Sequence, residues 1–187
     1  MIDRSNDEPQ LDRRSFLSAA AMTLAATRLG LVGIPTASSE GAASAHPVRP
    51  AQPTHTSFGP IKQIDAGVLN IGYAEDGPAN GPAVILLHGW PYDIHSFVDV
   101  APLLAAHGER VIAPYSRGYG TTRFLTTDTV RNAQQSAVAL DVIALMDALA
   151  IERATIAGFD WGARMAAVVG ALWPERCKSL VCVSGYL

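Results

Sequence analysis

The segment from Ala154 to Trp173 constrains the fold most, because an aspartate flanked by two glycines lies where a strand-like run meets a helical one. Ala154–Ala157 is short and apolar, and Trp161–Trp173 is rich in Ala, Val and Met. Between them lies Gly158-Phe159-Asp160-Trp161-Gly162. Glycines at these two places permit a tight turn and close packing of helix on strand. The sequence therefore predicts a strand–turn–helix elbow that exposes Asp160 above a sheet.

Other apolar runs place this elbow in an α/β sheet. Residues 83–87, 110–114 and 179–184 have strand length and continuous apolar character, typical of strands buried on both faces of a parallel sheet. Helical stretches alternate with these runs, which predicts a mostly parallel, doubly wound sheet. Residues 61–65 and 68–74, joined through Ala66-Gly67, predict an antiparallel hairpin at the edge of the sheet.

Three helices are expected between the strands. The first starts near Asp99 as N-cap, so that a proline falls in its first turn. The second has Asp128 as a reasonable N-cap. The second helix is predicted from an apolar stripe along one face, formed by Val138, Val142, Leu145 and Leu149. Asp141 and Asp147 lie outside this stripe. The third runs from Trp161 to about 173, is apolar on most sides, and is expected to be buried nearly all round.

The N-terminal part has a different character. Residues 12–17, with Arg13 and Arg14, resemble the twin-arginine export motif, and a short apolar run and a small-residue cleavage site before His46 follow. We therefore expect a signal peptide over residues 1–45, a proline-rich linker over 46–60 and the core domain over 61–187. The expected location is periplasmic or secreted, with the twin-arginine export machinery as a partner.

Composition excludes several classes of function. The formal net charge is −3 over 187 residues, without a basic patch, which argues against a nucleic-acid partner. The leader's apolar run is too short to span a bilayer, so no stable membrane anchor is expected. Of the two cysteines, Cys182 lies in an apolar run and is expected to be a small buried hydrophobe; a bridge to Cys177 is the less favoured alternative.

Asp160 carries the predicted chemistry. A carboxylate at such a turn lies at a helix N-terminus, which favours the anion. It can attack a saturated carbon to form an alkyl-enzyme ester, which water hydrolyses with the help of a histidine base. The structural alternative is an N-cap aspartate, a common use of Asp at a strand–helix junction. With both glycines in place, we favour the nucleophile.

The motif His88-Gly89-Trp90-Pro91 directly follows the strand that ends at residue 87. In a nucleophile-elbow fold, this loop and the residue after the nucleophile each supply a backbone N–H to an oxyanion site. The predicted donors are Trp90 and Trp161. For His88 we favour a buried imidazole bonded to its own loop over a catalytic role.

Three motifs in order make the chain resemble an α/β-hydrolase of the epoxide hydrolase and haloalkane dehalogenase branch. They are the His88 motif, Arg117-Gly118-Tyr119-Gly120 and the Asp160 elbow. The resemblance covers residues 61–187. It implies an α/β-hydrolase fold without the helical cap and the last strands, with Asp160 as nucleophile. His88, Gly89, Pro91, Arg117, Gly158 and Gly162 support these motifs.

The resemblance implies a small epoxide or haloalkane as substrate and neither cofactor nor metal. The family's cap tyrosines, acid and histidine base have no counterpart here: no histidine follows Asp160, and the one later carboxylate, Glu175, is poorly placed. We therefore expect this 187-residue chain alone to be inactive. Trp-Pro in the first motif favours epoxides, with dehalogenation or a non-catalytic fragment as alternatives. Tyr115 and Phe159 depart from the commoner family pattern and bear on substrate subtype.

Overall fold

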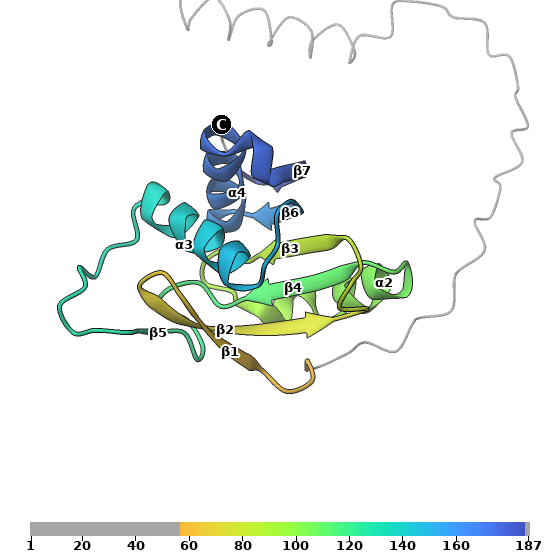
Figure 1. Cartoon of the computed structure of the whole chain (residues 1–187), viewed down its shortest axis with the longest axis horizontal. Helices are drawn as coiled ribbons and strands as arrows, with labels where there is room; N and C mark the ends of the chain where they lie inside the picture. Colours follow the sequence, from red (N-terminus) through yellow and green to blue (C-terminus); the bar gives the residue numbers. More distant parts are fainter. Residues whose placement is uncertain (1–56, 186–187) are drawn as a thin grey trace, which may run out of the picture. The chain divides into compact units, whose positions relative to one another are not determined.

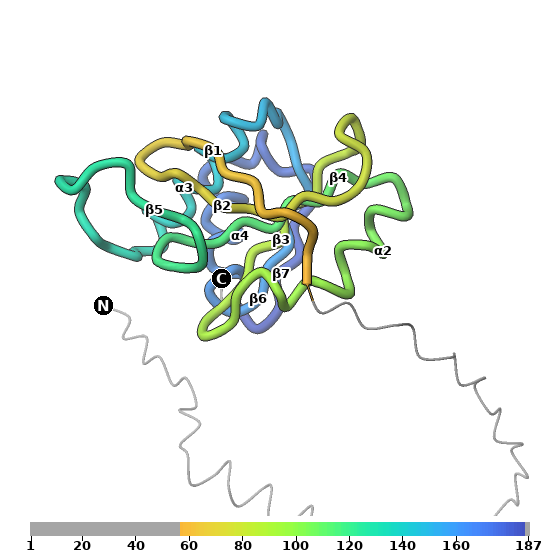
Figure 2. The backbone as a smooth tube through the Cα atoms, turned by 90° about the horizontal axis from the view of Figure 1, so that it is seen from below, coloured from red at the N-terminus to blue at the C-terminus, as the bar shows by residue number. Residues whose placement is uncertain are grey.

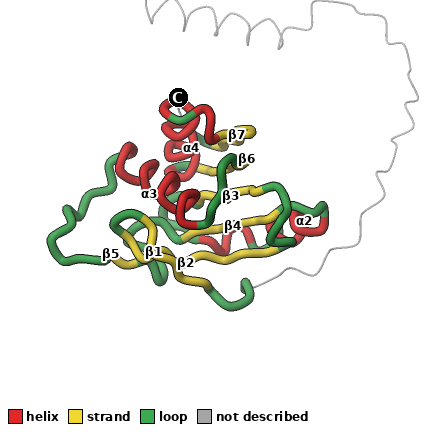
Figure 3. Tube along the Cα trace, in the orientation of Figure 1, coloured by secondary structure: helices red, strands yellow, loops and turns green. Residues whose placement is uncertain are grey.

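A computed structural model of the chain describes residues 57–185, which form a mixed sheet with helices on both faces (Figures 1 and 3). The strands are β1 (Lys62–Ala66), β2 (Leu69–Asp76), β3 (Ala83–Leu87), β4 (Arg110–Pro114), β5 (Arg123–Phe124), β6 (Ala154–Phe159) and β7 (Cys177–Val183). The helices are η1 (Ile94–Phe97), α2 (Val100–Ala106), α3 (Gln135–Ala148), α4 (Trp161–Leu172) and η2 (Pro174–Arg176).

The strand order confirms the predicted fold class. The sheet has the order β1-β2-β4-β3-β6-β7, with β5 paired to β2. Strands β4, β3, β6 and β7 are parallel neighbours, whereas β2 is antiparallel to β1, β4 and β5. The hairpin predicted around Ala66-Gly67 is present, and β1 lies at the edge of the sheet as expected.

Two apolar cores form, one on each face of the sheet, because strand side chains alternate between faces. On β3, Ile85 and Leu87 pack with α3 and α4, while Val84 and Leu86 pack with η1 and α2. All four side chains are buried, so β3 is apolar on both faces, as its continuous apolar sequence predicts. The carboxyl end of β3, at Leu87, leads directly to His88.

The start of the second helix was predicted wrongly. Asp128 caps no helix: α3 begins at Gln135, after a segment that runs out from the sheet at the end opposite α2 (Figures 1 and 2). In that segment the hydroxyls of Thr126 and Thr129 bond each other, and Thr127 donates to the Asp128 carboxylate. Such local side-chain bonds compete with helical ones. The first helix, by contrast, begins after Asp99 as predicted.

Two predictions of burial near the C-terminal end were also wrong. Cys182 is exposed, because β7 pairs with β6 alone among residues 57–185 and has little packed over it. Helix α4 buries one face on the sheet, but Leu172 is 60% exposed, so it is not covered all round. Cys177 and Cys182 are both free. They are five residues apart on one strand, about 16 Å, which is too far for a disulfide.

The predicted signal peptide and most of the predicted linker lie outside the described residues. Of the linker, only residues 57–60 are described, and β1 begins two residues later, at Lys62. None of the helices found among residues 57–185 has the length and apolar character needed to cross a membrane.

Candidate active site

The elbow holds Asp160 in an unusual backbone conformation between β6 and α4. Its φ is 52° and its ψ is −115°. A non-glycine residue at positive φ costs about 1–3 kcal/mol and persists only where its surroundings fix it. Here the Asp160 N–H donates to the Val183 carbonyl at 3.0 Å, and the Asp160 carbonyl accepts from the Arg164 N–H at 3.2 Å. The strained turn is therefore held by β7 on one side and by α4 on the other.

Three glycines make the approach of these elements possible. A Cβ on Gly162 would lie 1.9 Å from the Leu87 carbonyl oxygen, and one on Gly158 would lie 2.4 Å from the carbonyl carbon of Gly162. A Cβ on Gly89 would lie 2.6 Å from the Cβ of Asp160. No side chain fits at any of these contacts. The glycines therefore bring β3, β6 and α4 close enough for the loop after β3 to reach Asp160.

The Asp160 carboxylate is bonded by that loop. Its Oδ1 accepts a hydrogen bond from the backbone N–H of Trp90 at 3.0 Å. The N–H groups of Trp90 and Trp161, together with the Arg164 guanidinium, hold the pKa of the Asp160 carboxyl below its usual range. Asp160 occupies the N-cap position of α4, but its side chain makes no capping bond to that helix. The geometry thus favours an ionised carboxylate with Oδ1 restrained by the Trp90 N–H.

His88 is buried and bonded to its own loop. Its side chain is 1% exposed; Nδ1 lies 3.1 Å from the Gly89 carbonyl oxygen, and Nε2 accepts from the Ser116 N–H at 3.1 Å. Because Nε2 accepts, the proton of the neutral ring is on Nδ1, which donates to Gly89. Burial lowers the pKa of the imidazole, against the hydrogen bond to Gly89, so the ring is neutral at pH 7. His88 therefore stabilises the conformation of the loop after β3.

An apolar cavity of about 250 Å³ adjoins the two tryptophans. Its walls come from the loop after β3, the loop after β4, and α3 and α4. They are His88, Gly89, Trp90, Ser116, Arg117, Tyr119, Ala133, Val138, Trp161 and Met165. Trp90 is 68% exposed and joined to Pro91 by a cis peptide bond. Within residues 57–185, no group of three or more His, Cys, Asp or Glu side chains is arranged to hold a metal ion.

Comparison with known proteins agrees with this geometry. Residues 82–186 match the family model described as alpha/beta hydrolase fold. Epoxide hydrolase B of Mycobacterium tuberculosis is 36% identical over 104 residues, which are 56% of this chain and 29% of that protein. A crystal structure of a candidate epoxide hydrolase from Klebsiella pneumoniae is 66% identical, with a TM-score of 0.67 over 68% of this chain and 42% of that one. This chain belongs to the α/β-hydrolase family, on its epoxide hydrolase branch.

A haloalkane dehalogenase of Mycobacterium marinum is also similar, at 30% identity over 131 residues, which are 68% of this chain and 42% of that protein. The structure of potato epoxide hydrolase I has a TM-score of 0.63 and 31% identity, over 68% of this chain and 40% of that one. This α/β-hydrolase chain thus spans well under half the length of the relatives it matches.

The structure brings most of the predicted site residues together. The Asp160 carboxylate is bonded by the backbone N–H groups of Trp90 and Trp161, and three glycines pack behind these residues. The roles of these residues in a reaction stay predictions. Arg117 was singled out as part of a motif, and it lines the cavity next to the tryptophans.

Sequence reasoning missed two residues that contact this part of the hydrolase. Ser116 donates its N–H to His88, and the Tyr119 ring packs edge-on against His88 with ring centroids 4.7 Å apart. Both lie in or beside the motif that begins at Arg117. Its position after β4, next to the loop after β3 in a parallel sheet, was the signal that could have found them.

Proposed function

We propose that this protein opens epoxides by nucleophilic attack of Asp160. The observation that carries the proposal is the ionised carboxylate at the elbow, with Oδ1 held 3.0 Å from the Trp90 N–H. Oδ2 forms a bond to a ring carbon while the C–O bond of the ring breaks. The ring oxygen leaves as an alkoxide and takes a proton from an acidic hydroxyl or from solvent. The product is an ester between Asp160 and the opened substrate.

Hydrolysis of that ester completes the proposed cycle. Residues 161–187 contain no histidine to act as base, so in this chain hydroxide from solvent adds to the carbonyl carbon of the ester, and negative charge develops on Oδ1. The Trp90 N–H donates to this oxygen and the Trp161 N–H bonds the same carboxyl group, so both are placed to stabilise the charge, an effect of roughly 3–4 kcal/mol per donor in other oxyanion sites. The bond from that carbon to Oδ2 then breaks, Oδ2 takes a proton from solvent, and the diol leaves with Oδ2 as one of its two hydroxyl oxygens.

The substrate class is supported by the relatives and by the cavity. Several of the similar proteins are named epoxide hydrolases. The apolar walls next to Trp161 suit a hydrophobic substituent on the ring. Haloalkane dehalogenation is the second candidate, since it uses the same carboxylate and one similar protein is named a haloalkane dehalogenase. There the indole N–H groups of Trp90 and Trp161 would donate to the leaving halide.

Covalent labelling tests the proposal directly. The full chain is incubated with styrene oxide, and separately with 1-bromobutane, and the adduct is located by peptide mass spectrometry. We expect an ester on Asp160 with the epoxide, no adduct in Asp160→Asn measured within hours, before deamidation, and normal labelling in Asp65→Asn. Asp65 is an exposed carboxylate on β1, so it controls for unspecific alkylation. Labelling of D160N at the same rate contradicts the assignment, and labelling by the bromide alone favours dehalogenation.

A single turnover in ¹⁸O-labelled water distinguishes the two-step route from direct attack of water. In the proposed route the oxygen of water stays in the Asp160 carboxylate, and the first diol carries unlabelled oxygen. Label in the first diol instead contradicts an ester intermediate.

We also propose that the protein is exported by the twin-arginine route. Support comes from Arg13 and Arg14, the apolar run after them and the small residues before His46. Expression of the R13K/R14K variant in a bacterium with this pathway is expected to leave the protein in the cytoplasm, whereas the parent appears in the periplasm with residues 1–45 removed. Equal periplasmic amounts contradict the proposal.

A further inference from the structure

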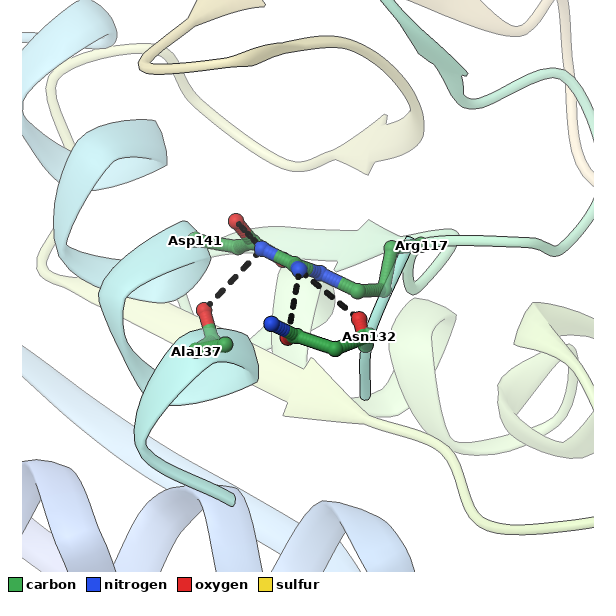
Figure 4. A network of polar contacts seen from close by, with 4 residues as sticks. All are labelled: Arg117, Asn132, Ala137 and Asp141. Carbon is green, nitrogen blue, oxygen red and sulfur yellow. Dashed lines mark hydrogen bonds and ion pairs between the residues drawn. The ribbon is translucent and has the colours of Figure 1, made fainter. Parts of the chain in front are cut away.

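Arg117 makes a dense set of bonds beside the cavity (Figure 4). Its Nε and Nη2 donate to the two carboxylate oxygens of Asp141 at 2.7 and 2.6 Å. Nη1 donates to the Asn132 carbonyl at 2.9 Å, and Nη2 also donates to the Ala137 carbonyl at 3.2 Å. The Arg117 and Asp141 side chains are 8% and 14% exposed. The guanidinium therefore fastens the loop after β4 to the first turns of α3 and to the segment before it.

The same loop supports His88. The residue before Arg117 is Ser116, whose N–H donates to Nε2 of His88, and two residues after it the Tyr119 ring packs against the imidazole. A shift of this loop would therefore remove two contacts that hold His88: the hydrogen bond from the Ser116 N–H to Nε2, and the packing of the Tyr119 ring. The Arg117–Asp141 ion pair is linked to His88 through one residue of backbone.

His88 in turn orients one peptide group. Its Nδ1–H donates to the Gly89 carbonyl, and the N–H on the other side of that same peptide bond is the Trp90 donor to Asp160. In a trans peptide the C=O and N–H point in opposite directions. Holding the carbonyl therefore aims the N–H, and a contact chain runs from α3 to the nucleophile.

We propose that Arg117 and Asp141 are positioning residues for Asp160, because their ion pair fixes the loop that orients the Gly89–Trp90 peptide. This inference rests on the proposed function for its catalytic meaning, but it concerns a geometry that can be measured without turnover. The planar guanidinium of Arg117 donates to two carboxylate oxygens and two carbonyl oxygens at once, which no other side chain can do.

A pair of double variants separates positioning from stability. R117M/D141L replaces the pair with apolar side chains, which avoids leaving one buried charge alone. E75L/R110M is the matched control: Arg110 Nε donates to Glu75 at 2.6 Å, the two side chains are 17% and 10% exposed, and Arg110 begins β4, at the opposite end of the strand from Arg117. Both pairs join neighbouring elements, but only one is linked to His88.

The first readout is the titration of the Asp160 carboxyl by carbon-13 NMR in the full chain. In R117M/D141L we expect the pKa of Asp160 to rise towards its ordinary value, because the Trp90 N–H no longer points at Oδ1. We expect no change in the control. R117K tests whether charge alone suffices: lysine lacks the fork, so we expect the same rise as in the double variant. A titration of R117M/D141L or R117K equal to that of the parent overturns the proposal, as does an equal rise in the control.

The second readout is the rate at which hydroxide hydrolyses the Asp160 ester at one alkaline pH. We expect this rate to fall at least about tenfold in R117M/D141L, the order of effect of weakening one oxyanion donor, and to stay within about twofold in E75L/R110M. An unchanged rate in R117M/D141L overturns the proposal. If the parent forms no ester, the proposed function fails, while the titration still decides whether Arg117 and Asp141 position the carboxylate.

Discussion

Glycine 162 is the sharpest test of the packing that builds the elbow. A Cβ there would lie 1.9 Å from the Leu87 carbonyl oxygen and 2.9 Å from that of His88, whereas ordinary contact begins at 3.4 Å. Both atoms are backbone and cannot rotate away, so β3 and α4 must separate. Overpacking of this kind costs up to about 3 kcal/mol, and the higher helix propensity of alanine returns at most about 1 kcal/mol. We expect Gly162→Ala to destabilise the protein by about 2 kcal/mol.

Gly170→Ala in the same helix is the matched control. Its Cβ would meet only the Leu180 side chain, at 3.2 Å, and that side chain is itself 39% exposed. Helix propensity then dominates, and we expect a change between zero and about 1 kcal/mol of stabilisation. The two variants carry the same substitution in the same helix, so their difference isolates the contact with β3.

Urea unfolding followed by tryptophan fluorescence measures this difference. With a slope near 2 kcal/mol per molar, typical of a small domain, the G162A midpoint is expected to lie about 1 M below that of the parent. Alkylation of Asp160 should also slow, because separating β3 from α4 moves the Trp90 N–H away from the carboxylate. Equal midpoints for G162A and G170A refute the argument that the approach of Leu87 selects glycine at position 162.

Two further predictions concern pH. Burial lowers the pKa of His88, so its contribution to stability is present above about pH 6.5, the unfolded value, and is lost as pH falls through the folded one. Thermal melting should show this loss in the parent and a flatter profile in His88→Asn. Burial opposes ionisation of Glu75, but hydrogen bonds from Lys62 and Arg110 outweigh it and lower the pKa of its carboxyl. Stability is therefore lost as pH falls below about 4.3, and the Glu75→Gln variant should not show this loss. Identical stability profiles of the parent and the variant at acid pH contradict the proposed effect of Lys62 and Arg110 on Glu75.

Local sequence determined much of the fold, since short-range patterns carry short-range structure. Continuous apolar runs marked β3, β4 and β6, and Ala66-Gly67 marked the hairpin. The two glycines and the aspartate of the elbow were enough to predict the turn. Glycine has no side chain, so only glycine lets a strand and a helix joined by a tight turn approach so closely.

The contacts of Arg117 with distant residues were beyond sequence patterns. Asp141 was read as a polar residue off the apolar stripe of α3, yet it is mostly buried because Arg117, 24 residues earlier, meets it. Asp128 looked like an N-cap, but Arg117 binds the Asn132 carbonyl in the segment before α3, and the helix starts only at Gln135. Neither pairing follows from periodicity.

The sequence by itself determined the position of Asp160 in the elbow, the order of strands and helices, and the loop that carries Trp90, because each depends on neighbours in the chain. Tertiary structure decided how those parts meet. Only the parallel pairing of β3 with β6 brings the Trp90 N–H to Asp160, 70 residues later. Only the folding of the loop after β4 against His88 and α3 fixes that N–H in place, since hydrogen bonds between distant residues form once the strands have aligned their ends.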